Sequence, residues 1–364
     1  MAAPSHPPSH PLPGRRTDTL REFHWTRDRH GRITALCEEA VAGQPAVRSL
    51  AHYSSGILDF AVCAAGRSPL SGLIAEPDEE LQDEALPGSR LLLCTQDLGA
   101  ALRPLGTGEL MRTVVANARG GLWGGRIKPG EFLAALTDDP HGVRPMDAAM
   151  NRLTTRIRVD VHSLPDELPG GAPEAGPVLR AGGSPESSLR VDFGTGAGPD
   201  TGTEARLRDL WHRHVDDVDL QYAAYYRDWT LVCAGDTFDS PALGPRFIDV
   251  SVRTRRTAYR DLSRVLRGHL ARLTDALHLV APATDGHPPL DRLVLDVQEG
   301  AVYVLWVSPR EFVIGVTLDQ LRVAPAEHRL RRLVREVRGL SGGRGMDGTD
   351  GVGEPRDLTA RPAR

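Results

Sequence analysis

The sequence has 364 residues, of which 40% are hydrophobic and 25% are charged, and its formal net charge is −4 at pH 7. This size and composition are typical of a globular chain with room for about two domains. The near balance of charge gives no overall field that would attract nucleic acid or an anionic membrane surface. Lys128 is the only lysine, and the absence of a Gly-Lys-Ser/Thr sequence excludes a Walker A phosphate loop.

The first 17 residues form an arm rich in Pro, Ser and His that we expect to be disordered, and they lack the apolar core of a signal peptide. The longest apolar run, residues 301–307, is far shorter than the roughly 20 residues of a membrane helix. The four cysteines form no CxxC pair and have apolar neighbours, which predicts buried thiols in a reducing compartment. We therefore expect a cytoplasmic protein without membrane insertion.

Residues 18–162 show the mixed periodicities of an α+β domain, which we expect to be separate from the C-terminal part. Ile33, Cys37 and Val41 follow the spacing of a helix with one apolar face. The glycine-rich stretch 120–125 around Trp123 predicts a surface turn, with a binding loop as the alternative. The other elements expected here are helices over 109–118, 130–136 and 146–153, a hairpin of strands 47–53 and 57–64, and strands over 89–94 and 154–162.

Residues 163–203 are dense in Gly, Pro, Ser and acidic residues and predict a linker, and residues 341–364 predict a disordered tail. The linker contains a motif that resembles the first motif of S-adenosylmethionine-dependent methyltransferases, in which a strand ends in an acidic residue and a glycine-rich turn approaches the cofactor. Its residues are Asp192, Gly194, Gly196 and Gly198, with Asp219 and Asp236 as possible ribose and adenine contacts. Pro199 follows immediately where the motif's helix should begin, so a flexible linker is the favoured interpretation and the cofactor site is an alternative.

Residues 204–340 give a clear pattern for a C-terminal domain. Three strands follow one another with connections of only two or three residues, which allows antiparallel neighbours and excludes parallel crossovers. A possible extra strand covers 247–252. The elements expected are a helix over 204–215, strands over 220–226 and 230–234, a long helix over 256–279, strands over 293–298, 302–307 and 312–318, and a helix over 325–340.

This order, α-β-β-α-β-β-β-α, resembles the roadblock/LC7 domain family, including the hairpin before the long helix and the Gly300 turn that leads into an apolar strand. The resemblance implies an antiparallel sheet with flanking helices, a homodimer, and protein partners such as a small Ras-like GTPase. The implied dimer interface lies on the long helix and two strands. Its residues are Leu262, Val265, Leu266, Leu270, Leu273, Val294 and Val302.

No residue set predicts a catalytic or metal site. His212 and His214 are two residues apart on a predicted helix, so their side chains diverge and cannot share a metal ion. The favoured function is therefore a non-enzymatic regulator or scaffold without a cofactor. The alternatives are the methyltransferase and a DNA-associated regulator, the latter from the arginine clusters at 253–256 and 329–338, although binding to nucleic acid is weakly supported.

A short internal similarity also occurs in the two predicted hairpins. The sequence Ala-His-Tyr at 51–53, followed by Val-Cys-Ala at 62–64, parallels Ala-Tyr-Tyr at 224–226, followed by Val-Cys-Ala at 232–234. A helix is expected before each hairpin. We interpret the similarity as chance between two hairpins rich in Ala and Val, with a duplicated fold as the alternative.

Overall fold

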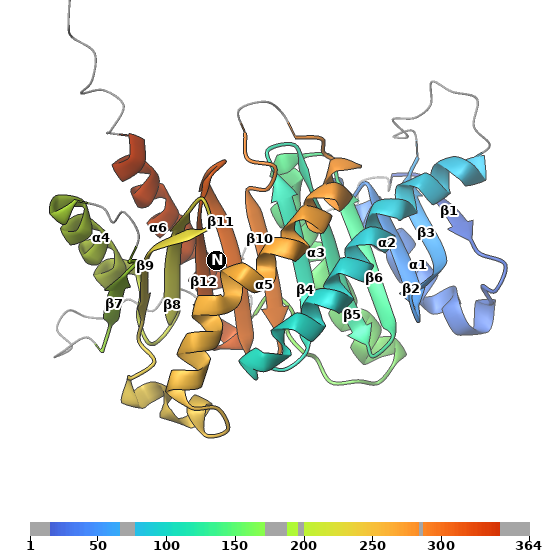
Figure 1. Cartoon of the computed structure of the whole chain (residues 1–364). Helices are drawn as coiled ribbons and strands as arrows, with labels where there is room; N and C mark the ends of the chain where they lie inside the picture. The colour runs from blue at the N-terminus through green and yellow to red at the C-terminus, as the bar shows by residue number, and fades with distance from the viewer. Residues whose placement is uncertain (1–14, 66–76, 172–187, 196–199, 284–286, 343–364) are drawn as a thin grey trace, which may run out of the picture.

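The computed structural model describes residues 15–65, 77–171, 188–195, 200–283 and 287–342. Its strands form one twelve-stranded sheet in which all neighbours are antiparallel (Figure 1). The order across the sheet is β1-β3-β2-β6-β5-β4-β10-β11-β12-β8-β9-β7. The strands are β1 (Thr17–Arg21), β2 (Ser49–Ser54), β3 (Ile57–Ala64), β4 (Leu110–Asn117), β5 (Gly120–Lys128), β6 (Glu131–Thr137), β7 (Arg190–Phe193), β8 (Tyr222–Arg227), β9 (Thr230–Asp236), β10 (Arg292–Val297), β11 (Gly300–Ser308) and β12 (Glu311–Thr317).

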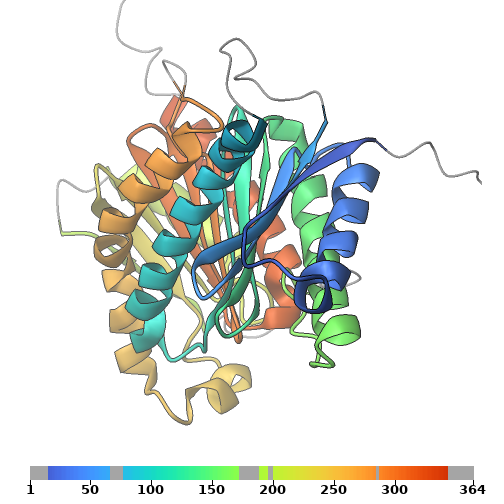
Figure 2. The ribbon, with the colours of Figure 1, turned by 90° about the vertical axis from the view of Figure 1, so that its right-hand side faces the viewer.

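Helices cover both faces of the sheet, so the molecule has three layers (Figure 2). α2 and α5 run side by side on one face, and α1, α3, α4 and α6 cover the other. The helices are α1 (Arg27–Gly43), α2 (Pro77–Leu102), α3 (Val143–Arg156), α4 (Thr201–His214), α5 (Val252–His278) and α6 (Val323–Gly342), with short helical turns η1 (Arg103–Leu105), η2 (Pro140–Gly142), η3 (Ile157–Val161), η4 (Pro241–Phe247) and η5 (Gln320–Arg322). Among the described residues, no helix combines the length and apolar character needed to cross a bilayer.

The same order of elements, β-α-β-β-α-β-β-β-α, occurs twice along the chain. β1 to α3 form the N-terminal half and β7 to α6 form the C-terminal half. Equivalent residues from β4 to α3 and from β10 to α6 lie 180 positions apart, as Arg112 and Arg292 or Glu131 and Glu311 illustrate. Both hairpins occupy the same place in this repeated order, which favours the duplicated fold that the hairpin similarity left as the alternative.

The C-terminal predictions are largely confirmed. The order of elements is the predicted one, and the sheet is antiparallel with flanking helices. The stripe of apolar residues in α5 and the short β10–β11 and β11–β12 turns account for this agreement, because both patterns are local. The extra strand over 247–252 is wrong: η4 ends at Phe247 and α5 begins at Val252.

Several N-terminal predictions are wrong. Residues 109–118 and 130–136 form β4 and β6 rather than helices, and 120–125 belong to β5 rather than to a surface turn. Residues 89–94 lie in α2, and 154–162 continue α3 into η3. Every residue of β4 is buried, so this strand lacks the alternation of a half-exposed strand and its apolar run cannot be distinguished locally from a buried helix.

The two halves share one sheet, so the prediction of a separate N-terminal domain is not confirmed. β4 pairs with β10 along its length, with Val114 opposite Val294. The predicted linker also contributes structure, because β7 within it pairs with β9 at one edge of the sheet. Most of the predicted arm and tail, residues 1–14 and 343–364, lies outside the described residues.

Candidate functional site at the joint between the two halves

The joint between the halves begins in the sheet itself. Across the sheet, β4 is the edge strand of the N-terminal half and β10 is the edge strand of the C-terminal half. Without the other half, each would present a free edge to solvent. Their antiparallel pairing removes both edges, and the register shifts once, between Asp296 and Val297. Since every strand residue at the joint is buried, separating the halves would expose apolar surface as well as unpaired backbone groups.

The second part of the joint is the contact between α2 and α5 on one face of the sheet (Figure 1). Leu91 and Leu98 of α2 share an apolar cluster with Leu266 and Leu273 of α5. The apolar side chains along one face of each helix are therefore buried partly by the sheet and partly by the other helix. The family resemblance implies that this face of α5 contacts a second copy of the chain. In the structure it contacts α2 of the same chain.

The seven predicted dimerisation residues lie in or near this joint. Six of them are buried inside the chain. They are Leu262, Leu266, Leu270, Leu273, Val294 and Val302. Val265 is half-buried at the surface, and Val302 lies one strand away from the joint on β11. A homodimer through these surfaces, as predicted, would first require the two halves to separate, because the N-terminal half already covers α5 and β10.

A groove runs along the outer surface of the joint, where the end of α2 meets the start of α5. Its volume is about 510 Å³. Its floor is apolar, with Pro104 and Leu105 on one side and Ala258 and Val265 on the other. Charged side chains from α5, including Asp261, line its rim. An apolar floor with a charged rim is typical of a surface that can receive a segment of another protein.

The opposite face of the joint holds a buried ionic cluster beneath α3 and α6. Arg112 of β4 forms ion pairs with Asp147 of α3 at 2.5 Å and with Asp296 of β10 at 3.1 Å. Arg292 of β10 forms ion pairs with Glu327 of α6 at 2.7 Å and with Asp147 at 3.2 Å. Arg112 and Arg292 are equivalent in the two halves, as are Asp147 and Glu327, so the cluster connects four elements across the joint.

The charges of the cluster shift the pKa values of its carboxyl groups in different directions. Burial by itself would raise the pKa of Glu327, but the charges and hydrogen bonds of Arg292 and Arg331 outweigh burial and hold that pKa well below its usual range. Burial raises the pKa of Asp296 to about 6, because Arg112 and the Gly170 N–H compensate only part of the desolvation. Glu327 is therefore ionised, and its charge depends on Arg292.

A second polar network lies in the N-terminal half, on residues that the sequence analysis did not identify. His52 connects two carboxylates, with Nδ1 2.8 Å from Asp59 and Nε2 3.0 Å from Glu131. Glu131 also accepts from His162 at 2.9 Å and pairs with Lys128 at 2.8 Å. The network joins three separate parts of the sequence, the hairpin of β2 and β3, the turn between β5 and β6, and the end of η3, so no single motif could have grouped its residues.

The electrostatics of this network follow from its burial. Burial would lower the pKa of His52, but the hydrogen bonds to Asp59 and Glu131 outweigh it and raise that pKa. Burial would likewise raise the pKa of each carboxyl group, and the bonds from His52 and its neighbours instead lower both to about 2. In the C-terminal half, Tyr225 occupies the position equivalent to His52, and its hydroxyl group donates a hydrogen bond to Glu311 at 2.8 Å.

The described residues of the proposed cofactor motif lie at one edge of the sheet. Asp192 lies in β7 and bonds to Arg190 and Arg260, and Gly194 follows it at the sheet edge. Because β7 runs antiparallel to β9, the parallel strands that the methyltransferase motif requires are not formed. Gly196 and Gly198 lie outside the described residues.

The two further candidates of that motif, Asp219 and Asp236, form ion pairs with arginines. Asp219 is fully buried and forms an ion pair with Arg329 at 2.8 Å. Asp236 bonds to Arg256 at 2.7 Å. Both arginines belong to the basic clusters that suggested a DNA-associated regulator. Their charges are thus partly neutralised inside the protein, which weakens that alternative.

The four cysteines are free and buried, as predicted. Among the described residues, no group of three or more His, Cys, Asp or Glu side chains is placed to hold a metal ion.

Comparisons with known proteins add little to this description. No protein-family model and no curated protein matches the chain. Among solved structures, a chain described as "MglB with tetrameric arrangement" is 15% identical, with a TM-score of 0.28. The match covers 37% of this chain and 90% of that chain.

Proposed function

We propose that this chain is a non-enzymatic regulator or scaffold that acts by binding other proteins, and that its two roadblock/LC7-like halves form internally the dimer expected between two copies. The observation that carries the proposal is the joint, in which β4 pairs with β10 and α2 contacts α5. The resemblance of the element order to roadblock/LC7 domains suggests a small Ras-like GTPase as the partner. Binding would then depend on surface shape.

An internal dimer predicts that the intact chain is a monomer. Light scattering should give a mass near 39.5 kDa, with no increase as the protein concentration rises. The matched sample is a fragment of residues 203–342, in which the apolar side chains of α5 and the edge of β10 lose their cover. We expect this fragment to dimerise or to aggregate. A stable dimer of the intact chain together with a soluble monomeric fragment would contradict the internal-dimer proposal.

The groove between α2 and α5 is the proposed docking surface for the partner. Thr257 is exposed and lines the groove, so Thr257→Arg should obstruct it without disturbing the core. Gly268 lies on the same helix, outside the groove, with open space around it, and Gly268→Arg is the matched control. A photo-reactive residue at 258 should crosslink a partner in cell extract, and Thr257→Arg but not Gly268→Arg should reduce that crosslink. Equal crosslinking in both variants would contradict docking in the groove.

A further inference from the structure

An aromatic pocket lies in the C-terminal half, away from the joint. It is bounded by α5, by the turn between β8 and β9, and by the turn between β11 and β12, and its volume is about 440 Å³. Trp229, Trp306 and Phe312 line it. The ring of Phe312 lies 4.9 Å from that of Trp229 and 5.9 Å from that of Trp306, and Tyr226 stacks on Phe312 at 5.1 Å. The pocket therefore has a continuous aromatic wall.

Trp229 is held in a backbone conformation that tryptophan rarely adopts. It is the second residue of a two-residue hairpin turn, with φ of 65° after Asp228 at 48°. Such turns require positive φ at both positions, and glycine usually occupies the second. The equivalent turn of the N-terminal half follows this rule with Gly56, at φ of 80°. A left-handed backbone is unfavourable for a bulky residue, so the backbone of this turn does not account for a tryptophan at position 229.

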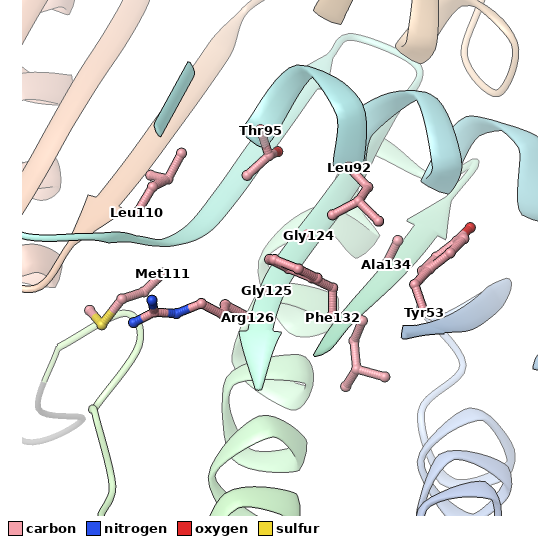
Figure 3. Close-up of a pocket in the computed structure, with 11 residues that line it drawn as sticks. Tyr53, Leu92, Thr95, Leu110, Met111, Gly124, Gly125, Arg126, Phe132 and Ala134 are labelled. Atoms are coloured by element: carbon pink, nitrogen blue, oxygen red, sulfur yellow. The ribbon is translucent and has the colours of Figure 1, made fainter. Parts of the chain in front are cut away.

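The N-terminal half provides an internal comparison. Aromatic side chains stand at two of the four equivalent positions, as Tyr53 and Phe132, but Gly56 and Arg126 stand where the C-terminal half has its tryptophans. Figure 3 shows the cavity that Tyr53, Arg126 and Phe132 line, and its volume is only about 10 Å³. The aromatic wall therefore does not follow from the fold alone, since the same fold in the N-terminal half has only two of the four aromatic side chains.

The rim of the pocket carries an available positive charge. The guanidinium of Arg267 lies 5.3 Å from the ring centre of Trp229. Within the part of the chain that the structure describes, Arg267 forms no ion pair. By contrast, the neighbouring Arg310 is neutralised by Asp228, at 2.5 Å. An anionic group at the mouth of the pocket would meet Arg267 directly.

We infer that this pocket binds a small planar aromatic anion, with its ring against Trp229 and Phe312 and its carboxylate or similar group on Arg267. The volume lies in the range of roughly 300–1,000 Å³ that is usual for small-molecule sites. Aromatic walls favour planar rings through stacking, and a guanidinium binds carboxylates through paired hydrogen bonds. This inference does not depend on the proposed protein partner.

Titration calorimetry of the intact chain with 2-naphthoate tests the inference, with the uncharged 2-naphthalenemethanol as the comparison. We expect saturable binding of one 2-naphthoate per chain and weaker binding of the alcohol. Arg267→Gln should weaken 2-naphthoate binding by about tenfold, the effect of losing one charge-assisted contact. It should leave binding of the alcohol unchanged. No saturable heat with 2-naphthoate, or an equal loss for both probes, would overturn the inference.

Two further variants separate ligand binding from folding. Trp229→Gly removes one wall of the pocket and relaxes the turn, so binding should be lost while the melting temperature does not fall. Phe312→Leu should also abolish binding, whereas Phe132→Leu, at the equivalent position of the N-terminal half, should leave it unchanged. Binding that survives Trp229→Gly, or that is lost equally in Phe132→Leu, would show that the probe binds elsewhere.

Discussion

Replacing Arg292 by leucine is expected to lower the free energy of unfolding by about 3–5 kcal/mol, the usual cost of removing one partner from a buried ion pair. Leucine would fill part of the space but would leave Glu327 with Arg331 alone and Asp147 with Arg112 alone. Both carboxylates are at least four-fifths buried at the side chain, so water cannot replace the missing guanidinium. Urea unfolding of the intact chain at pH 7 measures the effect.

An exposed ion pair provides the control. Arg310 and Asp228 form an equally short pair, but their side chains are 77% and 46% exposed. Arg310→Leu should therefore change the free energy of unfolding by no more than about 1 kcal/mol. A loss for Arg292→Leu that is no larger than this would show that the cluster beneath α3 and α6 does not stabilise the joint.

The second large effect is a stability optimum in mildly acidic solution, set by the network around His52. The pKa of Glu131 falls from 4.5 to about 2 and that of Asp59 from 3.8 to about 2, so their contribution is complete above about pH 4.5 and is lost as the pH falls towards 2. For Glu131 the shift corresponds to roughly 3 kcal/mol. The pKa of His52 is raised above 6.5, so its contribution is complete below pH 6.5 and is lost as the pH rises through its folded pKa.

The neighbouring His30 opposes His52 on the alkaline side. Burial lowers the pKa of His30, so its contribution is present above pH 6.5 and is lost as the pH falls through its folded pKa. The acidic side is therefore the clearer test. We expect the free energy of unfolding, measured by urea titration, to fall by several kcal/mol between pH 5 and pH 2, of which roughly 3 kcal/mol comes from Glu131.

The C-terminal half suggests a variant that should reduce this dependence. His52→Tyr combined with Asp59→Val introduces the residues found at the equivalent positions, Tyr225 and Val232. There Tyr225 donates to Glu311, and no carboxylate stands at the position of Asp59. Arg21→Ala, which removes an exposed ion pair in the same half, is the control. We expect the double variant to lose less stability than the control between pH 5 and pH 2. An identical pH profile in both proteins would contradict the assignment to His52 and Asp59.

The sequence predicted the C-terminal half well because its signals are local. The amphipathic stripe of α5 and the two tight turns beside β11 depend on neighbours a few residues apart. The burial of the four cysteines is likewise a local consequence of apolar neighbours. In the N-terminal half the same rules failed at β4 and β6, because these buried strands contain helix-favouring residues such as the Leu-Ala-Ala-Leu of 133–136, whereas the equally buried β10 to β12 are rich in valine.

The repeated fold shows which part of the sequence similarity between the two hairpins corresponds to equivalent positions in the structure. The parallel between 51–53 and 224–226 is in structural register, since both segments precede equivalent turns. The parallel between Cys63 and Cys233 is not, because the structure places Phe60 opposite His52 where Cys233 is opposite Tyr225. The first part of the sequence similarity therefore falls at structurally equivalent positions, whereas the second part is displaced by three residues.

The sequence by itself determined the order of strands and helices after residue 200, the antiparallel connections and the apolar face of α5, because each depends on residues close together in the chain. Only the tertiary structure decided what that face contacts. An apolar stripe specifies burial but not its partner, and the partner here is α2, more than 150 residues earlier in the sequence. The histidine network, the buried ionic cluster and the aromatic pocket likewise exist only where distant segments meet.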